Sequence, residues 1–418
     1  MVRHLLILSA ALVVACAKQA DPADAVVPEQ LAEVDVGINI LVFGDSGYQL
    51  GYVEQKYFDR PYKTKDDYLA FYREEWLEKH KPIEDIREPL LEFHEASGSY
   101  MPASGQLVVA KAMTEYCKQT DCDFGLMLGD NIYPDGATLG ADGVDDAKRF
   151  DDLLSEPYKG LAALREDFKI YATLGNHDWH TSREGAMAQV NYMREHPMLH
   201  MDDVFYSVVP PDTDGKVEIF VVDTEMLLQT TPVKDAILNP DGSEKLHEKY
   251  KSPRVSAIPE TDMERSQNVW LEGALRESTA DYKIVISHHP FWSAGGGKFE
   301  QARAIRRLIR PAVCEYADAV FSGHEHTLEA YIDDCSDIGV AREKPVLHLV
   351  SGAAGKQRSV HSSFVTEQNK AYPQRQLLFA EGGVFGFAGV ELGLGVARLH
   401  LYSVEPNGEM NELFDYEI

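Results

Sequence analysis

The stretch Phe124-Gly125-Leu126-Met127-Leu128-Gly129-Asp130-Asn131-Ile132-Tyr133 decides how this chain folds. Its first five residues are an apolar run typical of a buried strand, and Gly129 opens the loop that follows. Asp130 and Tyr133 in that loop offer two oxygen ligands to one hard cation. Asp130 has a second carboxylate oxygen for another cation, which indicates a two-metal hydrolytic site. The alternative is an ordinary Gly-Asp-Asn turn that binds no metal.

Six further apolar runs share the features of this strand, being short, bounded by turn residues and rich in Val, Ile and Leu. They are residues 38–43, 170–174, 217–222, 284–287, 319–322 and 346–350. Three amphipathic stretches between them are long enough for helices, at residues 147–164, 261–278 and 299–316. This alternation predicts an α/β fold with largely parallel strands covered by helices. From Arg375 onward we expect antiparallel strands, the last ending at Pro406-Asn407-Gly408.

One segment, residues 49–104, interrupts the alternation and is rich in Tyr, Lys, Glu and Asp. Within it, residues 66–80 and 83–93 are predicted to form exposed helices. We expect a helical insertion that caps the domain, and the alternative is a wall of the substrate site.

The chain is strongly acidic, with 68 acidic and 40 basic residues among 418 and a formal net charge of −28. This charge argues against nucleic acid as a partner, because binding a phosphate backbone requires clustered Lys and Arg. A small anionic substrate, such as a phosphate ester, would be repelled at long range and would need a local positive charge. Bound metal ions would supply that charge.

The first 16 residues have the features of an export signal. Arg3 precedes an apolar run at residues 5–14 that is too short to span a bilayer. Val13-Val14-Ala15-Cys16 resembles a bacterial lipoprotein processing box, in which Cys16 becomes the lipidated first residue. Cleavage at Ala15-Cys16-Ala17 is the alternative and would release a soluble secreted protein.

Residues 17–36 are expected to be a flexible tether, and residues 37–418 a single domain that contains the insertion. We expect an exported monomer in the periplasm or at the cell surface, with a lipid anchor as its only membrane contact. Four cysteines remain after processing, and an even number in an oxidising compartment suggests disulfides. Of three possible connectivities we expect the sequence-local one, Cys117 with Cys122 and Cys314 with Cys335, and the alternative is four buried thiols.

Five of the predicted strands are followed by loops whose side chains can bind metal. These loops are Gly44-Asp45-Ser46-Gly47, residues 129–133, Gly175-Asn176-His177-Asp178, Ser287-His288-His289-Pro290 and Gly323-His324-Glu325-His326. Ligands bind beyond the carboxyl ends of strands in open α/β sheets, so all five loops can converge on one crevice. A single loop of this kind could be a helix cap or a core histidine, but five together indicate a metal centre.

This series of motifs resembles the calcineurin-like metallophosphoesterase superfamily and, within it, the tartrate-resistant purple acid phosphatases. Most of the superfamily has Asp-x-His in the first motif, whereas the purple type has Asp-x-Gly, here ending at Gly47, and supplies a tyrosine, here Tyr133. The run from Val285 to Ser293 is similar to the small, tartrate-resistant members. The resemblance spans about residues 38–355 without the insertion. It implies a four-layer fold in which two central mixed sheets pack together and helices flank them.

The resemblance also implies two metal sites that share one bridging carboxylate. One metal would be bound by Asp45, Asp130, Tyr133 and His326, and the other by Asp130, Asn176, His288 and His324. The anionic oxygens of the first set suit a trivalent ion such as Fe(III), whereas imidazoles and an amide suit Fe(II), Zn or Mn. The implied reaction is hydrolysis of a phosphomonoester by a metal-bound hydroxide.

Around this centre, His177 is the candidate for orienting the phosphate, beside Asn176, and for protonating the leaving alkoxide, with a structural role as the alternative. His289 is expected to support His288 rather than to act on substrate. Glu325 is expected to be solvated or to support the ligands on either side of it.

Mammalian relatives carry a further histidine after Trp292-Ser293, where this chain has Ala-Gly-Gly-Gly-Lys. Lys298, Lys356 and Arg358 are candidate phosphate contacts, although we expect plain surface charges at all three positions. Two other functions remain open. One is a phosphodiesterase acting on nucleotides or lipid head groups, and the other is a non-catalytic surface lipoprotein.

Overall fold

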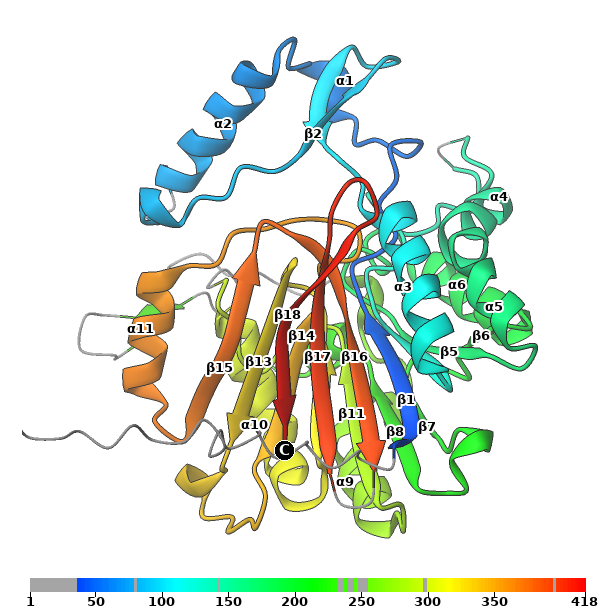
Figure 1. Cartoon of the computed structure of the whole chain (residues 1–418), viewed down its shortest axis with the longest axis vertical. Helices are drawn as coiled ribbons and strands as arrows, with labels where there is room; N and C mark the ends of the chain where they lie inside the picture. The colour runs from blue at the N-terminus through cyan, green and yellow to red at the C-terminus, as the bar shows by residue number, and fades with distance from the viewer. Residues whose placement is uncertain are drawn as a thin grey trace, which may run out of the picture. The chain divides into compact units, whose positions relative to one another are not determined.

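Two seven-stranded mixed sheets pack against each other at the centre of the molecule (Figure 1). The computed structural model describes residues 36–78, 81–141, 143–231, 236–238, 244–246, 255–295, 299–393 and 396–418. The residues from Val36 to Ile418 form one compact unit. The predicted signal sequence, the predicted tether up to residue 35, Cys16 and Lys298 lie outside the described residues.

The first sheet has the strand order β18-β17-β16-β1-β4-β5-β6. Its strands are β1 (Val36–Phe43), β4 (Phe124–Leu128), β5 (Lys169–Thr173), β6 (Leu199–His200), β16 (Phe385–Gly393), β17 (Ala397–Val404) and β18 (Met410–Glu417). Strands β1, β4, β5 and β6 are mutually parallel, and β16, β17 and β18 extend the sheet by antiparallel pairing.

The second sheet has the order β15-β13-β14-β12-β11-β8-β7. Its strands are β7 (Tyr206–Val208), β8 (Val217–Val222), β11 (Tyr282–Ser287), β12 (Ala319–Ser322), β13 (Thr327–Asp333), β14 (Val346–Ser351) and β15 (Arg375–Gly382). Here β8, β11, β12 and β14 are parallel to one another. At one edge β7 pairs antiparallel with β8, and at the other edge β13 pairs antiparallel with β14 and β15. The expected pair of mixed sheets is confirmed, but largely parallel pairing holds only at the centre of each sheet.

Helices cover the outer face of each sheet and complete four layers (Figure 1). Those beside the first sheet are α3 (Gln106–Thr120), α4 (Asp146–Phe150), α5 (Lys159–Leu164) and α6 (Arg183–Glu195). Those beside the second are α7 (Thr224–Gln229), α8 (Asp262–Arg265), α9 (Gln267–Glu277), α10 (Phe299–Tyr316) and α11 (Ser362–Ala371). In α3, the side chains of Val109, Met113 and Tyr116 recur at helical spacing and are buried, which fixes the face that packs on the sheet.

The predicted helices at residues 261–278 and 299–316 match α8 with α9 and α10. The predicted helix at residues 147–164 is less regular than expected. It begins in α4, passes through a π-helical turn (Asp151–Ser155) and a 3-10 turn (Glu156–Tyr158), and ends in α5.

The insertion contains two helices and a hairpin, namely α1 (Lys56–Asp59), α2 (Lys65–Glu78), β2 (Leu91–His94) and β3 (Ser99–Pro102). The helix predicted from residue 66 is present as α2. The helix predicted over residues 83–93 is wrong, because only a 3-10 turn (Ile83–Asp85) forms there before β2 pairs with β3. Pro89 explains the difference, since proline inside a helix removes a hydrogen bond and clashes with the preceding turn.

The insertion packs on the loop that follows β14. The backbone N–H groups of Arg87 and Leu90 donate to Ser359 Oγ at 2.8 Å and to Gln357 Oε1 at 3.0 Å. Its own small core consists of Tyr57, Tyr68 and Met101 with partly buried tyrosines around them. The segment therefore holds a defined position against residues 355–362 while burying little apolar surface of its own.

The antiparallel strands expected from Arg375 onward are present as β15 to β18. Pro406-Asn407-Gly408 does not end the last strand, however, but forms the turn between β17 and β18, with Gly408 at φ 87°. Disulfides join Cys117 to Cys122 and Cys314 to Cys335.

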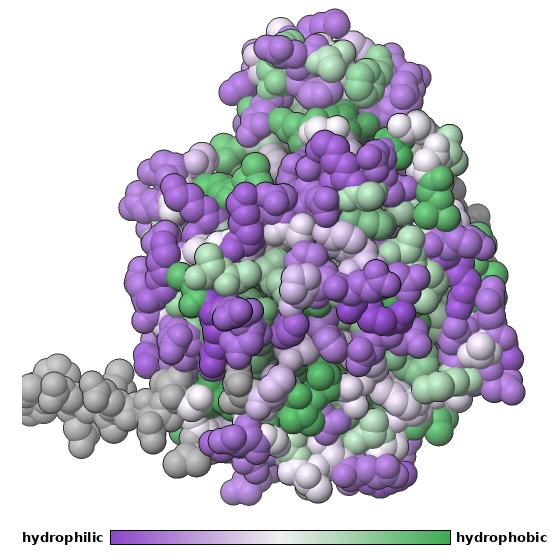
Figure 2. Space-filling model, turned by 90° about the vertical axis from the view of Figure 1, so that its right-hand side faces the viewer, coloured by the Kyte–Doolittle hydropathy of each residue, from purple (hydrophilic) through white to green (hydrophobic). Residues whose placement is uncertain are grey.

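Hydrophilic residues predominate on the face shown in Figure 2, and hydrophobic residues occupy smaller patches among them. None of the helices in the described part of the chain combines the length and the apolar character needed to cross a membrane.

Candidate metal centre

The loops after β1, β4, β5, β11 and β12 meet at the carboxyl ends of the parallel strands. Three non-glycine residues in these loops adopt left-handed backbone, namely Asp45 at φ 54°, Asp130 at φ 51° and His324 at φ 69°. This conformation is uncommon outside glycine and is held only where surrounding structure enforces it. Its occurrence at three predicted metal ligands shows that the loops are shaped to aim these side chains.

Two glycines allow the loops to approach one another closely. A Cβ atom on Gly47 would lie 1.9 Å from the carbonyl oxygen of Asn131, and one on Gly129 would lie 2.7 Å from Nδ1 of His288. The backbone of Gly47 also hydrogen-bonds across the gap, because Tyr133 N–H donates to its carbonyl at 3.0 Å. Glycine at position 47 is therefore a packing requirement that brings the Asp45 loop against the Tyr133 loop.

One group of donors surrounds the hydroxyl of Tyr133. The hydroxyl donates to Asp130 Oδ2 at 2.8 Å and to Asp45 Oδ1 at 3.1 Å. Nε2 of His326 lies 3.4 Å from the Tyr133 oxygen and 3.4 Å from Asp45 Oδ1. These four side chains are the set predicted for the trivalent metal.

A second group of donors surrounds Nε2 of His288. This nitrogen lies 3.3 Å from Asp130 Oδ1 and 3.1 Å from His324 Nδ1. Asp130 thus faces one group with Oδ2 and the other with Oδ1, which is the arrangement of a bridging carboxylate. Oδ1 of Asn176, in the loop after β5, is buried and has no hydrogen-bond partner in the described structure.

The chemistry of these donors fits two cations. Burial raises the pKa of the Asp45 carboxyl to about 8, so the anion requires a compensating positive charge. Burial, and then the carboxylates of Asp130 and Asp45, raise the pKa of Tyr133 well above its ordinary value. The unsatisfied amide oxygen of Asn176 is an acceptor oriented for a ligand that the protein itself does not provide.

Hydrogen bonds behind the donors fix their orientation. Nδ1 of His288 lies 2.9 Å from the carbonyl oxygen of Leu128, which can only accept, so Nδ1 carries a proton and Nε2 is the nitrogen directed at the other donors.

Asp178 was not recognised from the sequence as a site residue, although it directly follows the Asn176-His177 pair. Its carboxylate is fully buried and accepts from the N–H groups of Asn131, Ile132 and Gly175 at 3.0, 3.0 and 2.7 Å. It therefore ties the loop after β4 to the loop after β5.

His177 lies beside the donors, with its ring centroid 4.3 Å from that of Tyr133. Its backbone N–H donates to Asp130 Oδ1 at 2.8 Å, and its Nδ1–H donates to the carbonyl of Pro134. Burial lowers the pKa of His177 to about 4. Without a phosphate beside it, the ring is therefore neutral, with its proton on Nδ1 and a lone pair at Nε2.

His289 packs against the donors and contacts a different set of polar partners. Its Nδ1 lies 2.8 Å from Thr224 Oγ1, its Nε2 lies 3.5 Å from Glu225 Oε1, and its ring packs 4.3 Å from that of His324. This arrangement places His289 behind His324, and the expected role of His289 in supporting His288 stays a prediction.

Lys356 and Arg358 are not plain surface charges. Both side chains are half-buried, and the Lys356 ammonium lies over the rings of Tyr133 and Tyr48. Arg358 forms an ion pair with Glu325 at 2.6 Å, and Glu325 itself is fully buried rather than solvated. The structure thus places two cationic side chains beside Tyr133 and His326.

A two-sheet α/β sandwich with hard oxygen and imidazole donors clustered at its strand ends is the architecture of a binuclear metal hydrolase. The family model described as calcineurin-like phosphoesterase matches residues 38–328. The chain belongs to this family, and it is accordingly a metal-dependent phosphoric ester hydrolase that uses two metal ions.

Its relatives include acid phosphatases. The chain is 24% identical over 293 residues to tartrate-resistant acid phosphatase type 5 of Oryctolagus cuniculus, covering 69% of this chain and 77% of that one. It is 25% identical over 307 residues to purple acid phosphatase 4 of Arabidopsis thaliana, covering 72% and 76%. GAP50, the anchor in the inner membrane complex of Plasmodium, superposes with a TM-score of 0.50 at 15% identity, covering 91% of this chain and 88% of that one. This last likeness concerns the fold alone.

Proposed function

We propose that this protein is an acid phosphatase that hydrolyses small phosphomonoesters. The observation that carries the proposal is the position of the Tyr133 hydroxyl between the carboxylates of Asp45 and Asp130. The two carboxylates oppose ionisation of this phenol, and a strongly charged cation would offset their effect. A phenol in that place is therefore suited to bind such a cation as a phenolate. The relatives named as purple and tartrate-resistant acid phosphatases support the same assignment.

The proposed ligands fall into the two groups of donors. Asp45, Asp130, Tyr133 and His326 would hold Fe(III), and Asp130, Asn176, His288 and His324 would hold Fe(II), Zn or Mn. The chemistry that such a pair of cations supplies when bound is activation of water and neutralisation of charge on the phosphate.

The remaining side chains are proposed to orient the ester. The ammonium of Lys356 and the guanidinium of Arg358 lie on the Tyr133 side and would attract the phosphate dianion. His177 would contact a phosphate oxygen through Nε2, because Nδ1 is committed to Pro134 and an anion beside the ring favours the imidazolium. A protonated His177 could then return its proton to the departing alkoxide.

Metal content and turnover measured on the same protein test this function. We expect two metal ions per chain, hydrolysis of 4-nitrophenyl phosphate with an optimum below pH 7, and much slower hydrolysis of bis(4-nitrophenyl) phosphate. Faster hydrolysis of the diester would favour a phosphodiesterase, and fully loaded protein that hydrolyses neither ester would indicate a non-catalytic binding protein.

We also propose that the protein is an exported monomer anchored in the periplasm or at the cell surface through lipid on Cys16. The support is the sequence of residues 1–16, which lie outside the described residues. Labelling with a radioactive fatty acid should mark the wild-type protein and leave a Cys16→Ser variant unlabelled.

A further inference from the structure

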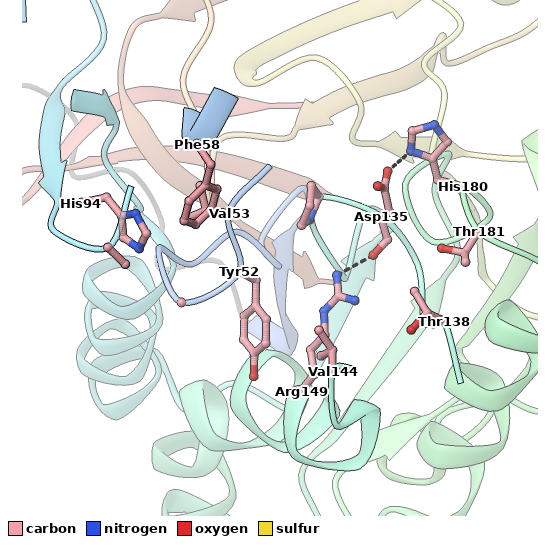
Figure 3. A pocket seen from close by; sticks show the side chains of 13 residues that line it. Tyr52, Val53, Phe58, His94, Asp135, Thr138, Val144, Arg149, His180 and Thr181 are labelled. Carbon is pink, nitrogen blue, oxygen red and sulfur yellow. Dashed lines mark hydrogen bonds and ion pairs between the residues drawn. The ribbon is translucent and has the colours of Figure 1, made fainter. Parts of the chain in front are cut away.

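A pocket of about 700 Å³ lies between the insertion and the loops that follow β4 and β5 (Figure 3). Volumes of this size accommodate whole small molecules, and a phosphate group alone would occupy only a fraction of it. In Figure 3, Tyr52, Val53, Phe58 and His94 line one side, and Asp135, Thr181 and His180 face them from the other.

The walls of the pocket are continuations of the loops that carry the proposed metal ligands. The loop after β1 runs on to Tyr52, Tyr133 is followed directly by Pro134, and the loop after β5 runs on to His180. The pocket is thus built next to the metal centre on the same loops, although none of the proposed metal ligands lines it.

His177 lies between the metal centre and the pocket. Its ring centroid is 4.3 Å from that of Tyr133 on one side and 5.8 Å from that of His180, a lining residue, on the other. An ester whose phosphate contacts His177 therefore has room for its alcohol part on the His180 side.

The lining offers little attraction for a second anion. Its one guanidinium, Arg149, is 3% exposed and donates to the backbone carbonyls of Tyr133 and Asp135. His180 is paired with the Asp135 carboxylate, whose side chain is 52% exposed. Nδ1 of His94, the other imidazole of the lining, lies 2.8 Å from Ser97 Oγ. A leaving group with a further phosphate or carboxylate would lie near the negative charge of Asp135 and be repelled by it. The cationic side chains of the lining already contact other partners and would not offset this repulsion.

Apolar and aromatic surface dominates the side formed by the insertion. Phe58 is 43% exposed and contacts His94 edge-on, with ring centroids 5.9 Å apart. The hydroxyl of Tyr52 donates to Asp152 Oδ2 at 2.7 Å, and its ring lines the pocket with the Arg149 guanidinium 5.3 Å from the ring centroid. Exposed rings that line a concave surface are suited to contact with another ring.

We propose that this pocket binds the leaving alcohol of the phosphomonoester and selects alcohols that carry an aromatic ring and no further negative charge. The inference rests on the proposed phosphomonoesterase function. In the reaction, the P–O bond to this alcohol breaks, the oxygen of water forms the new P–O bond, and a proton from that water leaves on the alcohol. In this proposal the insertion supplies the aromatic side of the pocket, and Asp135 on the opposite side supplies the discrimination against negative charge.

Substrates with similar leaving-group reactivity test the pocket without interference from the chemical step. Benzyl phosphate and ethyl phosphate both release simple primary alcohols, and 4-carboxybenzyl phosphate adds one negative charge. We expect kcat/KM for benzyl phosphate to exceed that for ethyl phosphate by about tenfold, the size of a typical aromatic contact. The carboxylated ester should be hydrolysed less efficiently than benzyl phosphate, and Val144→Lys, which adds a cation to the lining, should reverse that order.

Two matched variants test whether the preference for benzyl phosphate arises in this pocket. Phe58→Ala should reduce the benzyl-to-ethyl ratio about fivefold through loss of ring contact. Phe93→Ala is the control, because Phe93 is also on the insertion, is 49% exposed and has one ring contact, with Tyr100, but does not line the pocket. That variant should leave the ratio unchanged.

Binding of benzylphosphonate and ethylphosphonate, measured by calorimetry, separates this proposal from the proposed function. If neither ester is hydrolysed but benzylphosphonate binds more tightly and loses that advantage in Phe58→Ala, the pocket assignment stands and the phosphomonoesterase function fails. If both esters are hydrolysed with equal efficiency, or if Phe93→Ala changes the ratio as much as Phe58→Ala does, the pocket assignment is overturned and the function stands.

Discussion

The ammonium of Lys356 lies 4.3 Å from the ring centroid of Tyr133 and 4.9 Å from that of Tyr48. A cation over an aromatic ring is attracted by the ring itself, and more strongly by a ring that carries a negative charge. If Tyr133 is a phenolate bound to iron, Lys356 stabilises that phenolate and at the same time attracts the phosphate.

Replacing Lys356 by Met should affect both the binding of phosphate and the phenolate of Tyr133. Inorganic phosphate, used as a competitive inhibitor, should bind about tenfold more weakly, the equivalent of one charge-assisted contact. The visible absorption band should move to longer wavelength, because the phenolate loses a stabilising charge and becomes a better electron donor. Lys63→Met, an exposed lysine of the insertion, is the control and should leave the band and the inhibition constant unchanged.

Replacing Tyr133 by Phe should abolish the visible band of the iron-loaded protein, because the band requires charge transfer from a phenolate. Metal should remain at reduced affinity, since Asp45, Asp130 and His326 still surround the site. Tyr48→Phe is the matched control, because Tyr48 packs edge-on against Tyr133 and its hydroxyl donates instead to the carbonyl of Pro102. A band that survives in Tyr133→Phe would show that Tyr133 is not its source. Iron-loaded wild-type protein that is colourless and works best in alkali would place the protein among enzymes with two divalent metals.

Replacing Asp130 by Ala should remove both metal ions together, because its two oxygens face the two groups of donors. Metal analysis after dialysis should give less than one ion per chain and no measurable turnover. Glu115→Ala, on the exposed face of α3, should retain two ions. Recovery of two tightly bound ions in Asp130→Ala would rule out the bridging role.

The buried ion pair between Asp333 and Arg310 should make stability depend on acid pH. Burial opposes ionisation of Asp333. Two hydrogen bonds from the Arg310 guanidinium, at 2.7 and 2.8 Å, together with the electrostatic effects of His348 and Arg310 and the Cys335 N–H bond, outweigh burial and lower the pKa of Asp333 below its ordinary value. A lowered carboxyl pKa stabilises the fold above the unfolded-state pKa of about 4 and ceases to do so as pH falls through the folded value.

Asp333→Asn should therefore lower the free energy of unfolding by about 3 kcal/mol at pH 7, with the difference from wild type shrinking below about pH 4. Asp337→Asn, which removes a half-exposed partner of the same guanidinium, should have an effect below about 1 kcal/mol. Denaturant unfolding of the three proteins at pH 7 and pH 3 measures both effects, and equal losses at the two pH values would contradict the linkage.

The sequence was informative where chemistry and secondary structure coincide. Asp45, Asp130 and His288 each follow an apolar run, so both the strand and the side chain beyond it could be predicted, and the structure brings them together. The alternation of apolar runs with amphipathic stretches predicted the α/β fold class, because the spacing of hydrophobic residues within a strand or a helix depends only on local backbone geometry.

Contacts between segments that are distant in sequence could not be predicted from such local patterns. Lys356 and Arg358 looked like surface charges because nothing near them in sequence shows that the insertion covers their loop. Asp178 was missed because a buried carboxylate that accepts three backbone N–H groups looks, in sequence, like any aspartate after a histidine. The error over residues 83–93 arose differently, since Pro89 was a local signal against the predicted helix.

Asp45, Asp130 and His324 hold a backbone conformation that glycine would adopt with less strain. Each such residue raises the free energy of the folded chain by on the order of 1 kcal/mol, and the acidic donors around them repel one another until cations neutralise them. Metal binding therefore contributes directly to folding as well as to chemistry. A cell short of the metals that this protein binds would accumulate less of it, and not only a less active form, because the metal-free chain is exposed more often to proteases.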